Sequence, residues 1–244
     1  LSGNLSYAGS GTTSLATLWD KTRGTPDEVR AICAMQSMPY YLVTRNPNVK
    51  TIRDLTGQNK IALPSVKVSQ HALILEMAAA KLWGKSNYDR LDPLTISMAH
   101  PDAMVAMLSG KGEIDNHFAS SPFYYEELEQ PGVHLVLKSY DVIGGRHTNG
   151  VLYTTTKFHD ANPTVNKAVF DAFKEALEFI YAKPQAAAAI YMELTKDKRH
   201  SLATLEKWVL DPEVKYTHTP ENTIHFVHFM LHGKRLRPSL SRHY

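Results

Sequence analysis

Residues 61–83 constrain the fold more than any other segment, because they combine a strand signal, a polar loop and a helix signal. The apolar residues 61–63 predict a short buried strand, and Ser69 is suited to cap a helix over residues 70–83. Apolar residues recur at helical spacing and predict one buried stripe, formed by Leu73, Ile74, Met77, Ala78 and Leu82. The first N–H groups of such a helix lack internal partners and, with the helix dipole, favour an anion or a carbonyl oxygen.

Strand and helix signals alternate over the first 156 residues, and only helix signals follow. Strands are predicted at residues 5–8, 29–35, 40–45, 61–63, 94–97, 113–118, 134–137 and 151–156. Later helices are predicted to begin near Pro163, Pro184, Ser201 and Pro220. This order is typical of an α/β fold with a helical C-terminal region.

Three predicted strand-to-helix junctions carry small polar residues, at positions 9–13, 65–70 and 116–121. Ligands of open α/β sheets bind beyond the carboxyl ends of the strands. Three converging junctions would therefore form a polar ligand site rich in N–H and hydroxyl donors. The residues predicted to donate hydrogen bonds to ligand oxygens are Ser10, Thr12, Thr13, Ser69, Gln70, Asn116 and His117. Arg146, after two glycines, is either a charge partner for the ligand or a solvated side chain.

Motifs of common enzyme classes do not occur in the sequence. The segment GSGTTS at residues 9–14 lacks the third glycine of a dinucleotide fingerprint and the lysine of a phosphate-binding loop. No Gly-x-Ser-x-Gly nucleophile elbow is present. Asp115, next to Asn116 and His117, is either a catalytic group or a cap without chemistry. We therefore predict no catalytic residues, no cofactor and no enzyme activity.

Charge and hydropathy exclude several classes of partner. The net charge of +3 is small, and the longest basic run is the GKRLRP segment at residues 233–238, so we predict no nucleic-acid binding. No stretch approaches 18 consecutive apolar residues, so no membrane-spanning helix is predicted. The single cysteine, Cys33, lies in an apolar run and is interpreted as a buried strand thiol.

Histidines are frequent, and three of them share one face of the last predicted helix. His225, His228 and His232 are spaced by three and four residues, which suits metal binding. Ile224, Val227 and Leu231 define a neighbouring apolar face, and no carboxylate joins the row. We interpret the row as the solvated flank of that helix and predict no metal site, with metal binding as the alternative.

Several segments together resemble one family. They are LSGNLSYA at residues 1–8, TIRDLTGQNKIA at 51–62, AMVAMLSGKGEID at 103–115 and TPENTIHFVHFMLHG at 219–233. Their order and spacing are similar to those of substrate-binding proteins of ABC importers of the nitrate, sulfonate, taurine and thiamine-precursor type. The resemblance covers nearly the whole chain.

The resemblance implies a two-lobed type II periplasmic-binding-protein fold that closes on its ligand by a hinge motion. Residues 1–44 and 150–244 would form lobe one, and residues 45–149 lobe two. The strand and helix that usually precede the segment at residues 1–8 would be missing. The implied function is a receptor that captures a small polar or anionic molecule, such as a sulfonate, taurine or nitrate, in an interlobe cleft.

The resemblance also implies a setting. The receptor would be a monomer, periplasmic or exported and membrane-anchored, and would present its ligand to an ABC permease. The loop at residues 64–69 is not the usual Gly-Ser-rich version, which leaves the ligand class open. The alternatives are an enzyme of the same fold that acts on a pyrimidine or thiamine precursor, and a sensory ligand-binding domain. The single cysteine argues against the enzyme, because the related fungal proteins carry a cysteine-rich motif.

Overall fold

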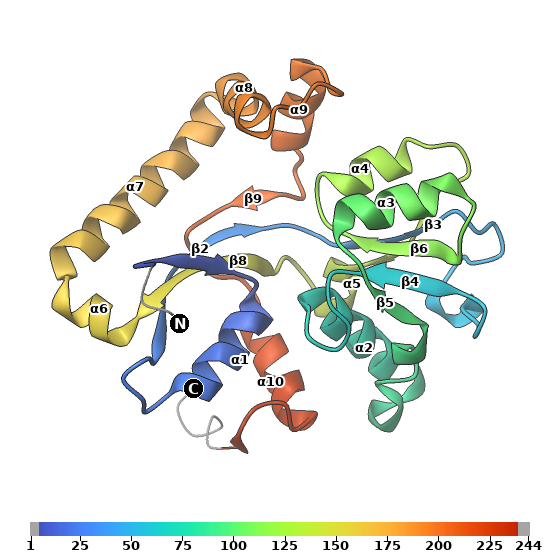
Figure 1. Cartoon of the computed structure of the whole chain (residues 1–244), viewed down its shortest axis with the longest axis horizontal. Coiled ribbons are helices and arrows are strands. Elements are labelled where there is room, and N and C mark those ends of the chain that lie inside the picture. The colour runs from blue at the N-terminus through green and yellow to red at the C-terminus, as the bar shows by residue number, and fades with distance from the viewer. Residues whose placement is uncertain (1–4, 239–244) are drawn as a thin grey trace. The chain divides into compact units, whose positions relative to one another are not determined.

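The chain forms two compact units in the computed structural model, which describes residues 5–238 (Figure 1). Unit 1 comprises Leu1–Met38 and Thr148–Glu221, and unit 2 comprises Pro39–His147 and Asn222–Tyr244. Residues 1–4 of the segment that carries part of the family resemblance lie outside the described residues. Within residues 5–238, no helix has the length and apolar character needed to cross a bilayer.

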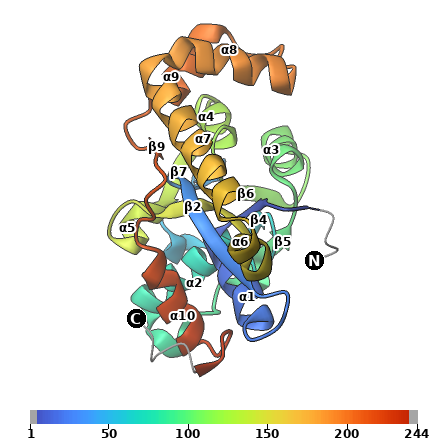
Figure 2. The same ribbon diagram turned by 90° about the vertical axis from the view of Figure 1, so that its left-hand side faces the viewer.

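Unit 1 is built around a sheet that, within the described residues, has the four-stranded order β1-β8-β2-β9 with every pairing antiparallel. Its strands are β1 (Ala8–Ser10), β2 (Val29–Ser37), β8 (Thr148–Thr155) and β9 (Lys215–Tyr216). Its helices are α1 (Thr12–Thr22), α6 (Thr156–Ala161), α7 (Pro163–Ala182), α8 (Pro184–Thr195) and α9 (Leu202–Val209). Figure 2 shows α7 passing beside β2, and α8 packs against α9.

Local signals in unit 1 are mostly confirmed, with two corrections. Cys33 is buried in β2, as predicted. The first strand begins three residues later and ends two residues later than predicted, because Gly9 and Ser10 pair with Leu152 and Val151 of β8. A short strand, β9, also follows residue 156, where only helices were predicted. Two residues that pair with the end of β2 give no strand signal of their own.

Unit 2 is built around a sheet with the five-stranded order β5-β4-β6-β3-β7 in the described residues. Its strands are β3 (Tyr41–Thr44), β4 (Lys60–Leu63), β5 (Thr95–Ser97), β6 (Ile114–Ala119) and β7 (His134–Lys138). Its helices are α2 (Gln70–Trp83), α3 (His100–Ser109), α4 (Phe123–Leu128), α5 (Ser139–Ile143) and α10 (Thr223–His232), with short 3-10 turns at Ile52–Asp54, Lys85–Asn87 and Asp92–Leu94. Helices α3 and α4 cover one face of the sheet, and α2 and α5 lie beyond the other (Figure 1).

The helix that follows β4 begins as the sequence predicts but is buried more completely. The Ser69 hydroxyl accepts a hydrogen bond from the Ala72 N–H at 3.3 Å, which confirms the N-cap. Leu73 and Ile74 of the predicted stripe are buried, and so are Leu75 and Glu76 on other sides of the helix. A single apolar stripe therefore underestimates the burial, because α2 packs against α5 and also meets Arg235 of the segment after α10.

The chain after Glu221 belongs to unit 2, whereas the sequence prediction included it in lobe one. Phe226 is buried on α10 and its ring meets the edge of the His147 ring at 5.5 Å. Arg235 forms an ion pair with the buried Glu76 of α2 at 2.7 Å. These contacts join residues about 80 to 160 positions apart, so no local pattern indicates them.

Candidate functional site

The carboxyl ends of three parallel strands meet at one edge of the unit 2 sheet. β4 pairs in parallel with β5 on one side and with β6 on the other. Each strand is followed by a segment that starts a helix, so Gln70, His100 and Ser120 all lie just beyond this edge. Such an edge is where open α/β sheets bind ligands. We call it the carboxyl edge of unit 2.

A chain of hydrogen bonds runs from this edge into the interior of unit 2. The Ser120 hydroxyl lies 3.0 Å from Nε2 of His100, and Nδ1 of His100 lies 2.8 Å from Nε2 of His117. Nδ1 of His117 lies 2.5 Å from Oε1 of Glu127 on α4. We call these four residues the histidine chain. His117 and Glu127 are fully buried, while His100 and Ser120 are partly exposed at the outer end.

Burial keeps the inner members of the histidine chain uncharged at neutral pH. Desolvation raises the pKa of Glu127 to about 9, with a smaller contribution from Glu126. Desolvation also lowers the pKa of His117 to about 3. The pKa of His100 is lowered to about 3 by desolvation and by the neighbouring His117. Although His117 and Glu127 are close enough for an ion pair, the fully buried contact is a hydrogen bond between neutral groups.

A third histidine, which lies beside the histidine chain, has an unsatisfied nitrogen. His71, in the first turn of α2, stacks on Tyr40 with ring centroids 3.8 Å apart and lies 5.1 Å from the His100 ring. It is 6% exposed, and its Nε2 has no hydrogen-bond partner among residues 5–238. Desolvation, followed by the nearby histidines, holds its pKa well below the ordinary value. A neutral, buried nitrogen without a partner is a site that a ligand atom or a water would satisfy.

Gln70 is held by a second group of buried polar side chains. Its Nε2 lies 3.3 Å from Nδ1 of His147, and its Oε1 accepts a hydrogen bond from the Tyr40 hydroxyl at 3.4 Å. Nε2 of His147 lies 2.8 Å from the Ser139 hydroxyl, which also accepts from the Tyr40 N–H. These contacts fix the amide of Gln70 and the ring of Tyr40 beside His71.

The structure relocates two predicted site residues. Asn116 and His117 were assigned both to the predicted strand at residues 113–118 and to the polar junction after it; both lie inside β6, paired with β3 and β4 on its two sides. The Asn116 amide donates to the Lys60 carbonyl at 3.2 Å, and its Oδ1 is buried without a partner among the described residues. Both ring nitrogens of His117 are engaged in the histidine chain. The junction itself begins at Ser120, because the strand continues to Ala119 through its ladder with β3.

Of the other unit 2 residues considered in the sequence, Ser69 and Asp115 have structural roles and Arg146 lies at the surface. Ser69 caps α2 through its hydroxyl. Asp115 accepts hydrogen bonds from the side chains of Asn46 and Asn59 and from the Lys60 N–H, which favours the interpretation as a cap over a catalytic role. The side chain of Arg146 is exposed.

The predicted residues of unit 1 lie where β1 ends and α1 begins. The Ser10 hydroxyl donates to the Gly11 carbonyl at 3.3 Å, and the Thr12 hydroxyl donates to the Thr148 carbonyl at 2.9 Å. The hydroxyl of Thr13 is buried and has no partner among the described residues. Of these three, only Thr13 has a buried hydroxyl that forms no hydrogen bond with residues 5–238.

Four residues of the carboxyl edge and its buried polar network were missed by the sequence prediction: His71, His100, Ser120 and Glu127. Ser120 lies within the predicted polar junction at residues 116–121 but was not among the predicted contacts, and His71, His100 and Glu127 carried no predicted role. A serine directly after a strand, followed by proline, was the one local signal available for Ser120. The partnership of the four depends on how β5, β6 and α4 are packed.

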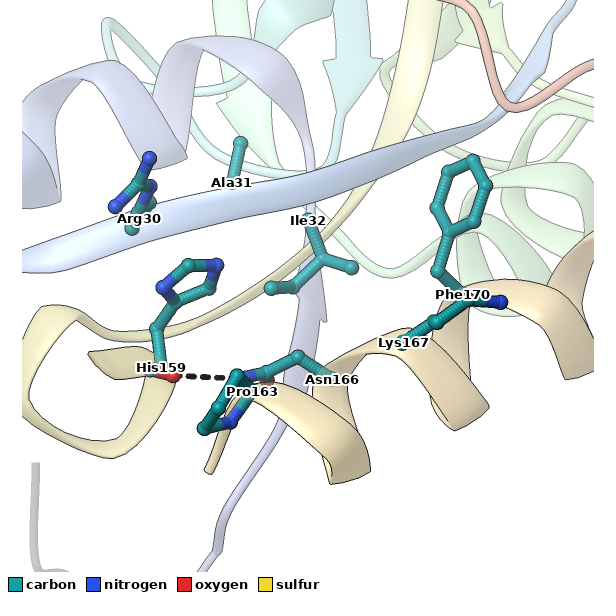
Figure 3. Close-up of a pocket in the computed structure, with 8 residues that line it drawn as sticks. All are labelled: Arg30, Ala31, Ile32, His159, Pro163, Asn166, Lys167 and Phe170. Carbon is teal, nitrogen blue, oxygen red and sulfur yellow. Dashed lines mark hydrogen bonds between the residues drawn. The ribbon is translucent and has the colours of Figure 1, made fainter. Parts of the chain in front are cut away.

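A separate hollow of about 410 Å³ lies in unit 1 beside β2 (Figure 3). Arg30, Ala31 and Ile32 line it from the strand, and the helices contribute His159, Pro163, Asn166, Lys167 and Phe170. Its two fixed cations are paired with carboxylates, Arg30 with Asp160 at 3.6 Å and Lys167 with Asp171. None of the predicted site residues lines this hollow, and we assign no ligand to it.

Metal binding gains no support from the described part of the chain. Across residues 5–238, no three histidine, cysteine or carboxylate side chains are placed to hold a metal ion. His225, His228 and His232 are all exposed on α10, as expected for a solvated flank. The buried face of that helix is formed by Phe226 and Met230.

Two α/β units, built from a chain that leaves the first unit and later returns to it, define a periplasmic-binding-protein fold. The family model described as NMT1/THI5 like matches residues 7–187, and the chain belongs to this family. This result confirms the family resemblance seen in the sequence. No curated protein matches the chain.

Solved structures with the same fold include three that cover most of this chain. The periplasmic aliphatic sulphonate binding protein SsuA from Escherichia coli is 16% identical, with a TM-score of 0.68 over 96% of this chain and 77% of that one. The alkanesulfonate-binding protein SsuA from Xanthomonas axonopodis pv. citri, bound to MOPS, is 14% identical, with a TM-score of 0.66 over 96% and 78%. The Candida albicans CA3427 gene product is 12% identical, with a TM-score of 0.64 over 96% and 75%.

Proposed function

We propose that this protein is a solute-binding receptor that captures a small polar or anionic organic molecule, of the sulfonate, taurine or nitrate kind, for an ABC importer. The observation that carries the proposal is the carboxyl edge of unit 2, where uncharged hydroxyl and imidazole groups gather. Neutral donors of this kind hold the oxygens of an anion through charge-assisted hydrogen bonds. Two structural relatives are named as sulfonate-binding proteins, which supports the same ligand class here.

The proposal includes the predicted residues of both units. In unit 2, Gln70 and the outer end of the histidine chain are the proposed contacts, and Ser69 orders the start of α2. In unit 1, Thr13 is the strongest of the three predicted hydroxyls, because it is buried and has no hydrogen-bond partner among the described residues. The protein would act as a monomer in the periplasm, or exported and membrane-anchored, and would deliver its ligand to a permease.

We further propose that the protein is not an enzyme, although Ser120 beside His100 has the spacing of a nucleophile and its base. A general base is effective when its pKa lies near the working pH. The pKa of His100 is lowered to about 3, so this imidazole is a very weak base at neutral pH. The serine is therefore suited to hydrogen bonding and poorly suited to attack.

The test is thermal unfolding and calorimetric titration of the protein with ethanesulfonate, taurine, MOPS, nitrate, succinate and zinc. A ligand present at a hundred times its Kd stabilises the folded protein by about 2.7 kcal/mol, which gives a clear rise in Tm. A rise with a sulfonate or another organic anion supports the proposal. A rise with zinc alone, or the absence of any rise with the organic anions, overturns it.

A further inference from the structure

Building on the proposed function, we propose that Ser120 donates a hydrogen bond to the ligand. The histidine chain behind Ser120 determines that its hydroxyl acts as the donor toward the ligand. The ligand must then present an acceptor oxygen to Ser120, as a sulfonate, a carboxylate or a carbonyl does. Ser120 would be a direct ligand contact, while His100, His117 and Glu127 would be positioning residues that act through it.

The donor and acceptor roles in the histidine chain follow from the number of N–H and O–H protons that its residues carry. A neutral imidazole has one N–H donor and one bare nitrogen acceptor. Both nitrogens of His100 and both nitrogens of His117 are used within the chain, so each ring must accept at one end and donate at the other. The direction set at the buried end is therefore transmitted to Ser120.

Glu127 sets the direction at the buried end. Its Oε1 is the atom that meets Nδ1 of His117, and its Oε2 is buried without a partner among residues 5–238. A proton on Oε2 would be a buried donor with nothing to bond, which is unfavourable. A proton on Oε1 donates to His117, and this arrangement agrees with a carboxyl group that burial keeps protonated.

The other bonds follow in turn. His117 accepts at Nδ1 and donates from Nε2 to His100, which accepts at Nδ1 and donates from Nε2 to the Ser120 oxygen. The Ser120 hydroxyl hydrogen then has no acceptor within the chain and is available at the partly exposed end. Its oxygen has no other hydrogen-bond partner in the described part of the protein.

His71 supports a ligand at this point independently. Its ring lies 5.1 Å from the His100 ring, and its Nε2 is buried without a partner in residues 5–238. Native structures leave few buried polar atoms unsatisfied, and those that remain often face a ligand or a water. An oxygen near Ser120 would lie in the same small group of side chains.

The first test measures the tautomers of the two histidines, and hence the donor direction of the histidine chain, without any ligand. Long-range proton–nitrogen NMR spectra of the nitrogen-labelled protein identify the tautomer of each histidine, and Ser120→Ala and His100→Gln assign the signals. The proposal expects both His100 and His117 as the Nε2–H tautomer. If both are Nδ1–H, the chain runs the other way, Ser120 donates inward, and the inference is overturned whatever the protein binds.

The second test measures ligand affinity. Titrations compare ethanesulfonate, which carries acceptor oxygens, with ethylammonium, which carries only donors, on wild type, Ser120→Ala and the neighbouring control Ser121→Ala. A hydrogen bond to a charged group corresponds to about a 10- to 150-fold change in affinity. We expect that loss of ethanesulfonate affinity in Ser120→Ala, wild-type affinity in Ser121→Ala, and no binding of ethylammonium.

The outcomes separate the inference from the proposed function. Equal ethanesulfonate affinity in wild type and Ser120→Ala overturns the inference and leaves the receptor proposal standing. Binding of ethylammonium that is lost in Ser120→Ala also overturns the inference, because it requires Ser120 to accept. A wild-type protein that binds neither ethanesulfonate nor any other organic anion overturns the receptor proposal, and the inference falls with it.

Discussion

Replacing Glu127 with glutamine should change how the stability of the protein depends on pH. In the folded protein burial raises the pKa of Glu127 from its ordinary 4.5 to about 9. Between these values the folded state holds a proton on Glu127 that the unfolded chain has lost. The unfolded state then binds fewer protons, so stability falls as pH rises through this window. Glutamine resembles the protonated acid in shape but cannot ionise, so the variant lacks this loss.

The expected magnitude follows from the linkage relation. One proton taken up on folding lowers the free energy of unfolding by about 1.4 kcal/mol per pH unit, or about 2 kcal/mol between pH 7 and 8.5. Glu76, whose pKa is raised to about 7, has a similar effect that is largely complete below this window. The depressed histidines act in the opposite direction and mostly below pH 6.5, where the unfolded chain gains protons.

Urea denaturation at several pH values from 7 to 8.5, followed by circular dichroism, measures the difference between Glu127→Gln and wild type. We expect Glu127→Gln to gain about 2 kcal/mol relative to wild type across this range. Glu129→Gln, an exposed position at the end of α4, is the matched control and should stay parallel to wild type. If stability fell in parallel with pH for wild type and Glu127→Gln, Glu127 would already be ionised at pH 7. That result would refute the inference that the histidine chain is uncharged.

Further predictions concern the packing of unit 2 and the chemistry of its edge. Arg235→Ala should lower stability by about 1–3 kcal/mol in chemical denaturation at pH 8, because it leaves the buried Glu76 carboxyl without its partner, and by less at pH 6, where Glu76 takes up a proton instead; replacing both residues with methionine should restore most of the loss. Ser69→Ala should cost about 1 kcal/mol in the same assay through loss of the helix cap, and a change below about 0.3 kcal/mol would contradict that role. Hydrolysis of p-nitrophenyl acetate should be equally slow in wild type and Ser120→Ala, since a rate that depends on Ser120 would argue for an enzyme.

Local physical chemistry made much of the fold predictable. The cap at Ser69 and the helix starts at Pro163 and Pro184 are short-range features, and they were predicted correctly from neighbouring residues. The order of strands and helices also indicated the α/β class, because it depends on periodicity within each segment.

The positions of Asn116 and His117 were decided by tertiary structure. A strand ends where its ladder of hydrogen bonds ends, and β6 extends to Ala119 because β3 continues to pair with it. The sequence predicted this strand over residues 113–118, but it also counted Asn116 and His117 in the junction, because it does not show the ladder that holds them inside the sheet. The same reason explains why residues after Glu221 join unit 2, since only the packing of Phe226 and Arg235 reveals their neighbours.

By itself the sequence determined the fold class, the family resemblance, the caps and the polar character of the strand-to-helix junctions, because each depends on residues close together in the chain. Only the tertiary structure brought Ser120, His100, His117 and Glu127 into one hydrogen-bonded chain. It also decided their protonation, because a pKa is set by burial and by neighbours from other elements. A glutamate on a helix that looks solvated in the sequence is thereby a neutral donor beneath the candidate site.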